Sequence, residues 1–213
     1  MNLQGKTAAF LGDSITQGVY YTALDNGEYQ WHQMNIKYCD VAGEILGLSI
    51  KNYGISGTCI CPDTVQLPDR AFIKRYNEMD DADLVCVLGG TNDFGTDVKI
   101  GNPDDLCEDT FYGALNILCE GLVKKYSGKT VVFITPLYRV CGKNKNGNIL
   151  ADYRDAIVQI AGKKFGFNII DGLSLGLEKN TENLKELLSD GLHPTPPAHE
   201  IIGKNLAEKL ICL

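Results

Sequence analysis

The sequence lacks a surplus of basic residues. Its 213 residues include 20 Lys and Arg against 27 Asp and Glu, which gives a formal net charge of −7 at pH 7, and the pI is near 5.0. The basic residues that are present form no prominent local cluster. Because phosphate backbones and anionic lipid surfaces attract basic proteins, this balance argues against nucleic acid and membranes as partners.

The sequence also lacks long apolar runs. Near the N-terminus only residues 8–11 are continuously apolar before the charged Asp13, which is too short for the apolar core of a secretory signal. No other run approaches the roughly 20 residues that a membrane-spanning helix needs. We therefore expect a chain that stays in the cytoplasm.

Cysteine is not scarce, but its spacing lacks the pattern of a metal site. Eight cysteines are present, and they lie on apolar patterns, such as Cys86 within residues 84–88. The one close pair, Cys59 and Cys61, has C-x-C spacing with no histidine or second pair nearby. We expect free thiols, no metal and no cofactor.

Short apolar segments alternate with helical patterns along the whole chain. Repeated β-α units favour a parallel sheet with helices on both faces. We predict a single α/β domain over residues 1–213, a flavodoxin-like three-layer α/β/α fold with the strands in the spatial order 2-1-3-4-5. One of the intervening helices is expected to begin at residues 102–105. The expected strands are residues 7–11, 48–53, 84–88, 130–134 and 167–170.

A serine stands directly after the first expected strand. The apolar run gives way to Gly12-Asp13-Ser14, and ligands of parallel sheets gather at the carboxyl ends of the strands. A serine hydroxyl becomes a good nucleophile only when a base takes its proton, so this position needs a histidine, an orienting carboxylate and oxyanion donors. The alternative for Ser14 is the N-cap of the following helix.

Later segments place suitable groups at the same sheet edge. Asp190 and His193 lie three residues apart in a loop rich in Gly and Pro, so one turn can set the carboxylate beside one ring nitrogen while the other faces Ser14. The glycine-rich turn around Gly57 can point a backbone N–H into a site, and the turn after residues 84–88 carries Asn92. Each motif alone also fits an ordinary turn or cap.

Taken together, these blocks resemble the SGNH, or GDSL-type, hydrolases, a family of serine esterases and acylhydrolases on a flavodoxin-like sheet. The matching residues are Gly12-Asp13-Ser14-Ile15-Thr16, Gly57, Gly90-Thr91-Asn92-Asp93 and the D-x-x-H of Asp190 and His193. The resemblance implies that Ser14 attacks the acyl carbon, that His193 is general base and then acid, and that Asp190 orients His193. The implied oxyanion donors are the backbone N–H groups of Ser14 and Gly57 and the side chain of Asn92.

The remaining carboxylates and histidines near these motifs have ordinary interpretations. Asp13 and Asp93 are expected to brace loops rather than to take part in catalysis. His199 lies on the last expected helix and is interpreted as structural, and His32 is given no role because a lone histidine in a loop is usually solvated or structural.

A polar and aromatic stretch over residues 17–33 follows the serine motif and departs from shorter members of the family. We expect a long loop that emerges beside the serine and walls a substrate pocket. Its rings have polar tips suited to a partly wet wall, and the alternative is that they pack on the edge of the core. The candidate substrate-binding residues are Tyr20, Tyr21, Tyr29 and Trp31.

The sequence therefore predicts a serine hydrolase that cleaves carboxylic esters with a short acyl group, such as acetyl on a carbohydrate, through an acyl-enzyme intermediate. Its partner is then a small-molecule ester. A thioesterase or a lysophospholipase-like acylhydrolase is the alternative among enzymes, and it would need a longer apolar groove. The alternative of another class is a non-catalytic flavodoxin-like binding module in which Ser14 caps a helix near a phosphate. The oligomeric state is left open.

Overall fold

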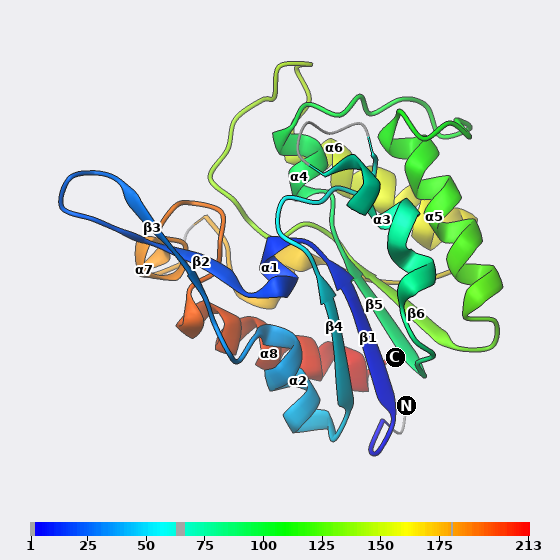
Figure 1. Cartoon of the computed structure of the whole chain (residues 1–213), viewed down its shortest axis with the longest axis horizontal. Coiled ribbons are helices and arrows are strands. Elements are labelled where there is room, and N and C mark those ends of the chain that lie inside the picture. The colour runs from blue at the N-terminus through cyan, green and yellow to red at the C-terminus, as the bar shows by residue number, and fades with distance from the viewer. Residues whose placement is uncertain (1–2, 63–66, 180) are drawn as a thin grey trace.

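The computed structural model describes residues 3–62, 67–179 and 181–213. Five parallel strands form its main sheet: β1 (Thr7–Gly12), β4 (Ser49–Gly54), β5 (Leu84–Leu88), β6 (Thr130–Ile134) and β7 (Asn168–Ile170). Their spatial order is β4-β1-β5-β6-β7 (Figure 1). Counted among themselves along the chain, these strands have the predicted order 2-1-3-4-5, so the fold class is confirmed.

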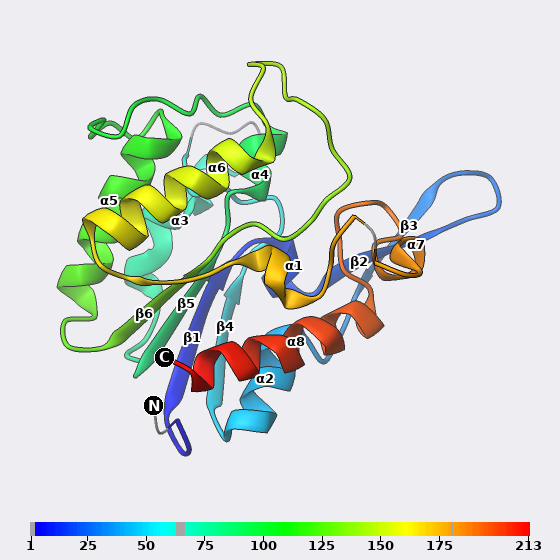
Figure 2. The same cartoon turned by 180° about the vertical axis from the view of Figure 1, so that it is seen from behind.

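Helices cover both faces of this sheet (Figures 1 and 2). One face carries α2 (Tyr38–Leu46) and α8 (Pro196–Ile211). The other carries α3 (Phe72–Arg75), α5 (Phe111–Lys125) and α6 (Leu150–Ile157), which continues as the π-helical segment η3 (Val158–Lys164). The shorter helical elements are α1 (Ser14–Gln17), α4 (Thr91–Gly95), α7 (Leu184–Leu187), η1 (Pro68–Arg70), η2 (Tyr76–Glu78) and η4 (Gly172–Leu175).

Alternating side chains along the buried strands divide the interior into two apolar cores. In β5, Val85 and Val87 join the core under α3, α5 and α6, whereas Leu84, Cys86 and Leu88 join the core under α2 and α8. Both faces of the strand are therefore covered, which explains why it stands out in the sequence as one continuous apolar run.

Residues 17–33 do not form the expected loop. Gln17 ends α1, and residues 19–33 form a β-hairpin in which β2 (Val19–Ala23) pairs antiparallel with β3 (Tyr29–Gln33) and which projects from the body of the fold (Figure 1). The turn contains Asn26-Gly27, and Gly27 has a φ of +82°, which glycine adopts without strain. The prediction was wrong because β-branched and aromatic residues on both sides of an Asn-Gly turn favour a hairpin.

The helix expected from residues 102–105 begins later, at Phe111. Asp105 accepts hydrogen bonds from the Asn102 backbone N–H and from the Thr110 hydroxyl, both at 2.9 Å, and so closes a turn. Thr110 is the N-cap of α5, and its Oγ1 accepts a hydrogen bond from the backbone N–H of Gly113. Asp105, at the expected start of the helix, thus binds the backbone of a non-helical turn instead.

Within the described part of the chain, no helix combines the length and the apolar character needed to cross a membrane. Among the same residues, which include all eight cysteines, no disulfide forms. No three His, Cys, Asp or Glu side chains of these residues gather as a metal site.

Candidate active site

Ser14 is the first residue of α1, directly beyond the carboxyl end of β1. Asp13 is the N-cap of this helix, since its Oδ1 accepts a hydrogen bond from the backbone N–H of Ile15 at 2.9 Å. The capping role considered for Ser14 therefore belongs to its neighbour, and the Ser14 hydroxyl is available to another partner. Ser14 is also sheltered, with 3% of its surface exposed.

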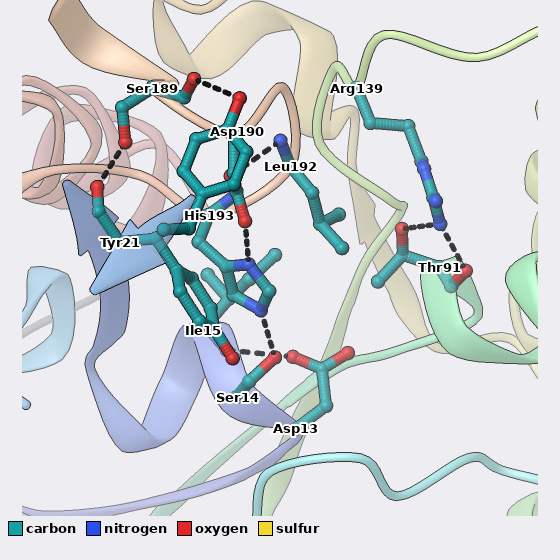
Figure 3. Close-up of polar contacts among 11 residues, drawn as sticks. Asp13, Ser14, Ile15, Tyr21, Thr91, Arg139, Ser189, Asp190, Leu192 and His193 are labelled. Carbon is teal, nitrogen blue, oxygen red and sulfur yellow. Dashed lines mark hydrogen bonds and ion pairs between the residues drawn. The ribbon is translucent and has the colours of Figure 1, made fainter. Parts of the chain in front are cut away.

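The partner of the Ser14 hydroxyl is His193. Ser14 Oγ lies 2.9 Å from His193 Nε2, and His193 Nδ1 lies 2.6 Å from Asp190 Oδ2 (Figure 3). The second carboxylate oxygen, Asp190 Oδ1, accepts hydrogen bonds from the backbone N–H groups of Leu192 at 3.0 Å and His193 at 2.8 Å. The three predicted residues thus form one hydrogen-bonded series from carboxylate to hydroxyl.

The surroundings of Asp190 keep its carboxyl group ionised. Burial by itself raises the pKa, but the hydrogen bonds from the His193 ring and from the two backbone N–H groups outweigh it and bring the pKa of Asp190 below its ordinary value. A charged carboxylate at Nδ1 favours the tautomer with the proton on that nitrogen. His193 Nε2 is then free to accept a proton from Ser14.

The β2–β3 hairpin lies beside this histidine. The Tyr21 and His193 ring centroids are 5.0 Å apart, and the Tyr21 carbonyl accepts a hydrogen bond from the Ser189 hydroxyl (Figure 3). The Tyr29 hydroxyl donates to the Ser189 carbonyl at 3.4 Å. Trp31 pairs directly across from Tyr21, so Tyr21, Tyr29 and Trp31 share the hairpin face that turns toward the candidate site.

Tyr20 lies on the opposite face of the hairpin. Its ring stacks on His32 with centroids 4.9 Å apart, and His32 Nε2 is 2.9 Å from the Thr22 hydroxyl. The structure therefore brings Tyr21 against His193 and Tyr29 to neighbouring Ser189, places Trp31 on the same hairpin face, and leaves Tyr20 on the opposite face. Trp31 and Tyr29 are 53% and 51% exposed, so neither ring packs on the core as the alternative supposed.

The predicted oxyanion donors lie on neighbouring turns at the same sheet edge. Gly57 follows β4 and has a φ of +77°, and Asn92 is in the first turn of α4 after β5. One N–H of the Asn92 side chain donates to the Thr58 carbonyl at 2.9 Å, which ties the two turns together. None of the described residues accepts a hydrogen bond from the backbone N–H of Ser14 or Gly57.

A family model covers this constellation. The model of the GDSL-like lipase/acylhydrolase family matches residues 10–201, a span that holds all five predicted catalytic and oxyanion residues. The chain belongs to the GDSL-like lipase/acylhydrolase family. The resemblance noted from the motifs is thus confirmed. No curated protein matches the sequence.

Solved structures resemble this GDSL-family chain over nearly its full length. One crystal structure has a TM-score of 0.85 and 25% identity, covering 100% of this chain and 99% of its own. A protein from Lactobacillus plantarum has a TM-score of 0.81 and 28% identity, covering 99% and 98%. An acetyl xylan esterase from Geobacillus stearothermophilus has a TM-score of 0.65 and 19% identity, covering 99% and 97%, a likeness of fold.

The sequence reasoning missed Arg75, which ties together the loops of this GDSL-family site. Arg75 is only 3% exposed. Its Nη1 donates to the Tyr53 carbonyl at 2.6 Å, and its Nη2 donates to the Gly12 carbonyl at 2.7 Å and to the Thr58 hydroxyl at 3.2 Å. One guanidinium thus holds the ends of β1 and β4, from which the turns that carry Ser14 and Gly57 depart.

Asp93 and His199, which the sequence analysis interprets as structural, are hydrogen-bonded to backbone N–H groups. Asp93 accepts hydrogen bonds from the backbone N–H groups of Ile60 at 3.1 Å and Cys61 at 3.0 Å, and burial raises its pKa to about 7. His199 Nδ1 accepts a hydrogen bond from the Tyr38 backbone N–H at 3.0 Å. Burial lowers the pKa of His199 to about 3, so this ring is neutral and holds the start of α2 in place.

Proposed function

We propose that this chain is a serine hydrolase that cleaves carboxylic esters with a short acyl group through an acyl-enzyme intermediate. The observation that carries the proposal is the hydrogen-bonded series from Asp190 Oδ2 through His193 to Ser14 Oγ, with distances of 2.6 and 2.9 Å. Membership of a family of lipases and acylhydrolases supports it. The partner that follows from it is a small-molecule ester.

In the proposed first half-reaction, His193 Nε2 takes the proton of the Ser14 hydroxyl while Oγ attacks the acyl carbon. The carbonyl electron pair moves onto its oxygen and returns when the tetrahedral intermediate collapses. The C–O bond to the alcohol then breaks, and the leaving oxygen takes the proton from Nε2. Water repeats these steps on the acyl-enzyme, which releases the acid and restores Ser14. Asp190 stays ionised and stabilises the imidazolium, and no step needs a cofactor.

We assign stabilisation of the oxyanion to the backbone N–H groups of Ser14 and Gly57 and to the Asn92 side chain. The bond from Asn92 to the Thr58 carbonyl uses one of the two amide hydrogens and fixes the plane of the group, so the second hydrogen is already oriented when charge develops. Neutral donors that are set in place beforehand stabilise the transition state without reorganisation, which makes this arrangement effective.

The hairpin supports a short acyl group. Tyr21, Tyr29 and Trp31 lie on its face toward the site. Aromatic rings with polar tips form a partly wet wall, whereas a long acyl chain needs a continuous aliphatic groove. An acetyl group on a carbohydrate is the substrate that we favour, since the exposed rings offer flat apolar surface and an acetyl xylan esterase shares the fold.

Two other functions make different demands on the chain. A thioesterase or a lysophospholipase-like acylhydrolase needs a longer apolar groove, which the aromatic hairpin face does not favour. A non-catalytic flavodoxin-like binding module would use Ser14 as a helix cap, but Asp13 fills that position. Such a module also does not require a histidine that is hydrogen-bonded to Ser14.

A serine-directed fluorophosphonate probe tests the proposal. We expect it to label Ser14 of the wild-type protein, with labelling greatly slowed by His193→Ala because the hydroxyl loses its base. The matched control is Ser174→Ala, which removes an exposed serine in η4 and should label at the wild-type rate. Absence of labelling in the wild-type protein would contradict the hydrolase and favour the binding module.

A further inference from the structure

A pocket that the proposed reaction does not use opens beside the loop that follows β6. It lies between the loop over residues 135–149, which runs from β6 to α6 (Figure 2), the first turn of α6 and Leu173 of η4, and it encloses about 380 Å³. This volume falls within the range of small-molecule sites. Neither Ser14 nor His193 lines it, so the proposed reaction leaves this pocket without a role.

The charge of the lining is opposite to that of the whole protein. Arg139, Lys143 and Arg154 line the pocket, and none of its lining residues among the described part of the chain is an Asp or a Glu. The chain as a whole carries a net charge of −7. Arg154 is paired with Asp171, which does not line the pocket, whereas no described carboxylate pairs with Arg139 or Lys143, and these two cations favour an anionic occupant.

Both arginines in this wall keep part of their hydrogen-bonding capacity unused. Arg139 Nη1 donates to the Thr91 carbonyl at 2.8 Å and to its hydroxyl at 3.2 Å (Figure 3), and Arg154 Nη2 pairs with Asp171 Oδ1 at 3.0 Å. Arg139 Nη2 and Arg154 Nη1 are accessible, and no described residue accepts a hydrogen bond from either. These two nitrogen atoms can therefore donate to an anion that enters the pocket.

The rest of the lining is apolar. Ile149, Leu150 and Leu173 face the same space as the two arginines. A hydrated inorganic ion gains nothing from such a wall, whereas an organic anion can bury its apolar part there. The pocket therefore matches a ligand that has one charged end and one apolar end.

We propose that this pocket binds a small organic carboxylate, with the carboxylate group at Arg139 and Arg154 and the apolar body against Leu150 and Leu173. The planar guanidinium fork matches the two oxygens of a carboxylate. Such an anion is either a free acid or a carboxylate that a larger molecule carries. In both cases it binds apart from Ser14, and the site is independent of the proposed hydrolysis.

Calorimetric titration with benzoate tests this site. We expect benzoate to bind with one-to-one stoichiometry, and benzamide, which has the same shape without the charge, to bind at least tenfold more weakly. Labelling Ser14 beforehand with the fluorophosphonate should leave benzoate binding unchanged. Loss of binding after labelling would place the anion in the active site and overturn the proposal. Inorganic phosphate binding as tightly as benzoate would also overturn it, since the apolar wall would then contribute nothing.

The decisive variant is Ala151→Asp, with Ala151→Asn as its matched control. An aspartate in the first turn of α6 suits the helix dipole, so the variant should keep the wild-type melting temperature while it places a carboxylate in the pocket wall. We expect at least a tenfold loss of benzoate affinity for Ala151→Asp and less than a threefold change for Ala151→Asn. Equal affinities of these two variants would show that the charge of this wall does not bind the ligand.

Separate arms distinguish the two sources of the carboxylate. Octanoate, as a free acid, and the monomethyl ester of octanedioic acid, as a carboxylate carried by an ester, are titrated against protein labelled at Ser14. If either compound binds, and if its affinity falls in Ala151→Asp, the site is supported, and the compound that binds shows which source of carboxylate the site accepts. Failure of both, together with failure of benzoate, overturns the site while leaving the labelling of Ser14 and the proposed hydrolase untouched.

Discussion

Replacing Asp13 with asparagine should change how stability depends on pH. The residue is 1% exposed, its Oδ1 caps α1 through the Ile15 backbone N–H, and its Oδ2 has no partner among the described residues. Burial raises the pKa of Asp13 from 3.8 to about 6, although the hydrogen bond from Ile15 and the charges of His193 and Arg75 oppose the rise. The folded protein therefore keeps a proton that the unfolded chain releases near pH 4.

The sign and size of the effect follow from this difference. Between pH 4 and about 6 Asp13 binds more protons in the folded state than in the unfolded state, so its contribution to the free energy of unfolding falls as the pH rises and is constant again above this window. A shift of about two pKa units corresponds to about 3 kcal/mol, at about 1.4 kcal/mol per unit. Asp13→Asn removes this contribution and keeps an oxygen for the cap. The free energy of unfolding of the variant minus that of the wild type should therefore increase by about 3 kcal/mol from pH 4 to pH 8.

Guanidinium chloride unfolding followed by far-UV circular dichroism measures this difference. Fluorescence is a poor probe here, because the single tryptophan lies on the exposed hairpin. Asp25→Asn, in the exposed hairpin turn, serves as the control and should leave the difference from the wild type constant with pH. The contribution of Asp93 is present in both proteins. If the free energy of unfolding of the wild type and of Asp13→Asn changed in parallel with pH, the pKa of Asp13 would not be raised in the folded state.

Four further predictions concern the site. Ser14→Ala and His193→Ala should each lower kcat about 10⁴-fold or more, and the double variant should be hardly worse in ester hydrolysis, whereas additive losses would contradict a shared role. Asn92→Ala should lower kcat about 10²- to 10³-fold with little change in KM, and a raised KM at constant kcat would make Asn92 a ground-state ligand. Arg75→Met should cost about 3–5 kcal/mol of unfolding free energy, because it leaves buried carbonyls unpaired. The matched Arg70→Met, which changes an exposed side chain paired with Glu78, should cost under about 1 kcal/mol. Finally, kcat/KM for p-nitrophenyl esters should fall from acetyl to octanoyl, and a rise with chain length would reveal an acyl groove.

The elements that the sequence predicts best are those whose burial restricts which residue types can occur there. β5 is covered on both faces, so burial itself selects the unbroken apolar run of residues 84–88. The turns after such runs could be placed at one sheet edge, and with them Ser14 and Asn92. The hairpin has no such signature, because it projects from the body and most of its side chains reach water. Its strands are marked only by propensity and by the Asn26-Gly27 turn.

Other features depend on partners that no residue type reveals. Arg75 binds the carbonyl oxygens of Tyr53 and Gly12, and every residue carries such an oxygen. The division of the hairpin into two faces, with Tyr21 toward His193 and Tyr20 away from it, depends on the pairing register. A shift of one residue would exchange these two rings, so residue composition alone cannot decide which of them reaches the site.

In the proposed reaction Ser14 carries the acyl group during turnover. Acid quenching of the wild-type protein within milliseconds of mixing with p-nitrophenyl acetate, followed by peptide mapping by mass spectrometry, tests it directly. We expect an acetyl group on Ser14 that disappears when quenching is delayed until the ester is exhausted, and no acetylated peptide from Ser14→Ala. Undiminished hydrolysis by Ser14→Ala, or an acetyl group on another residue during turnover, would show that Ser14 is not the nucleophile.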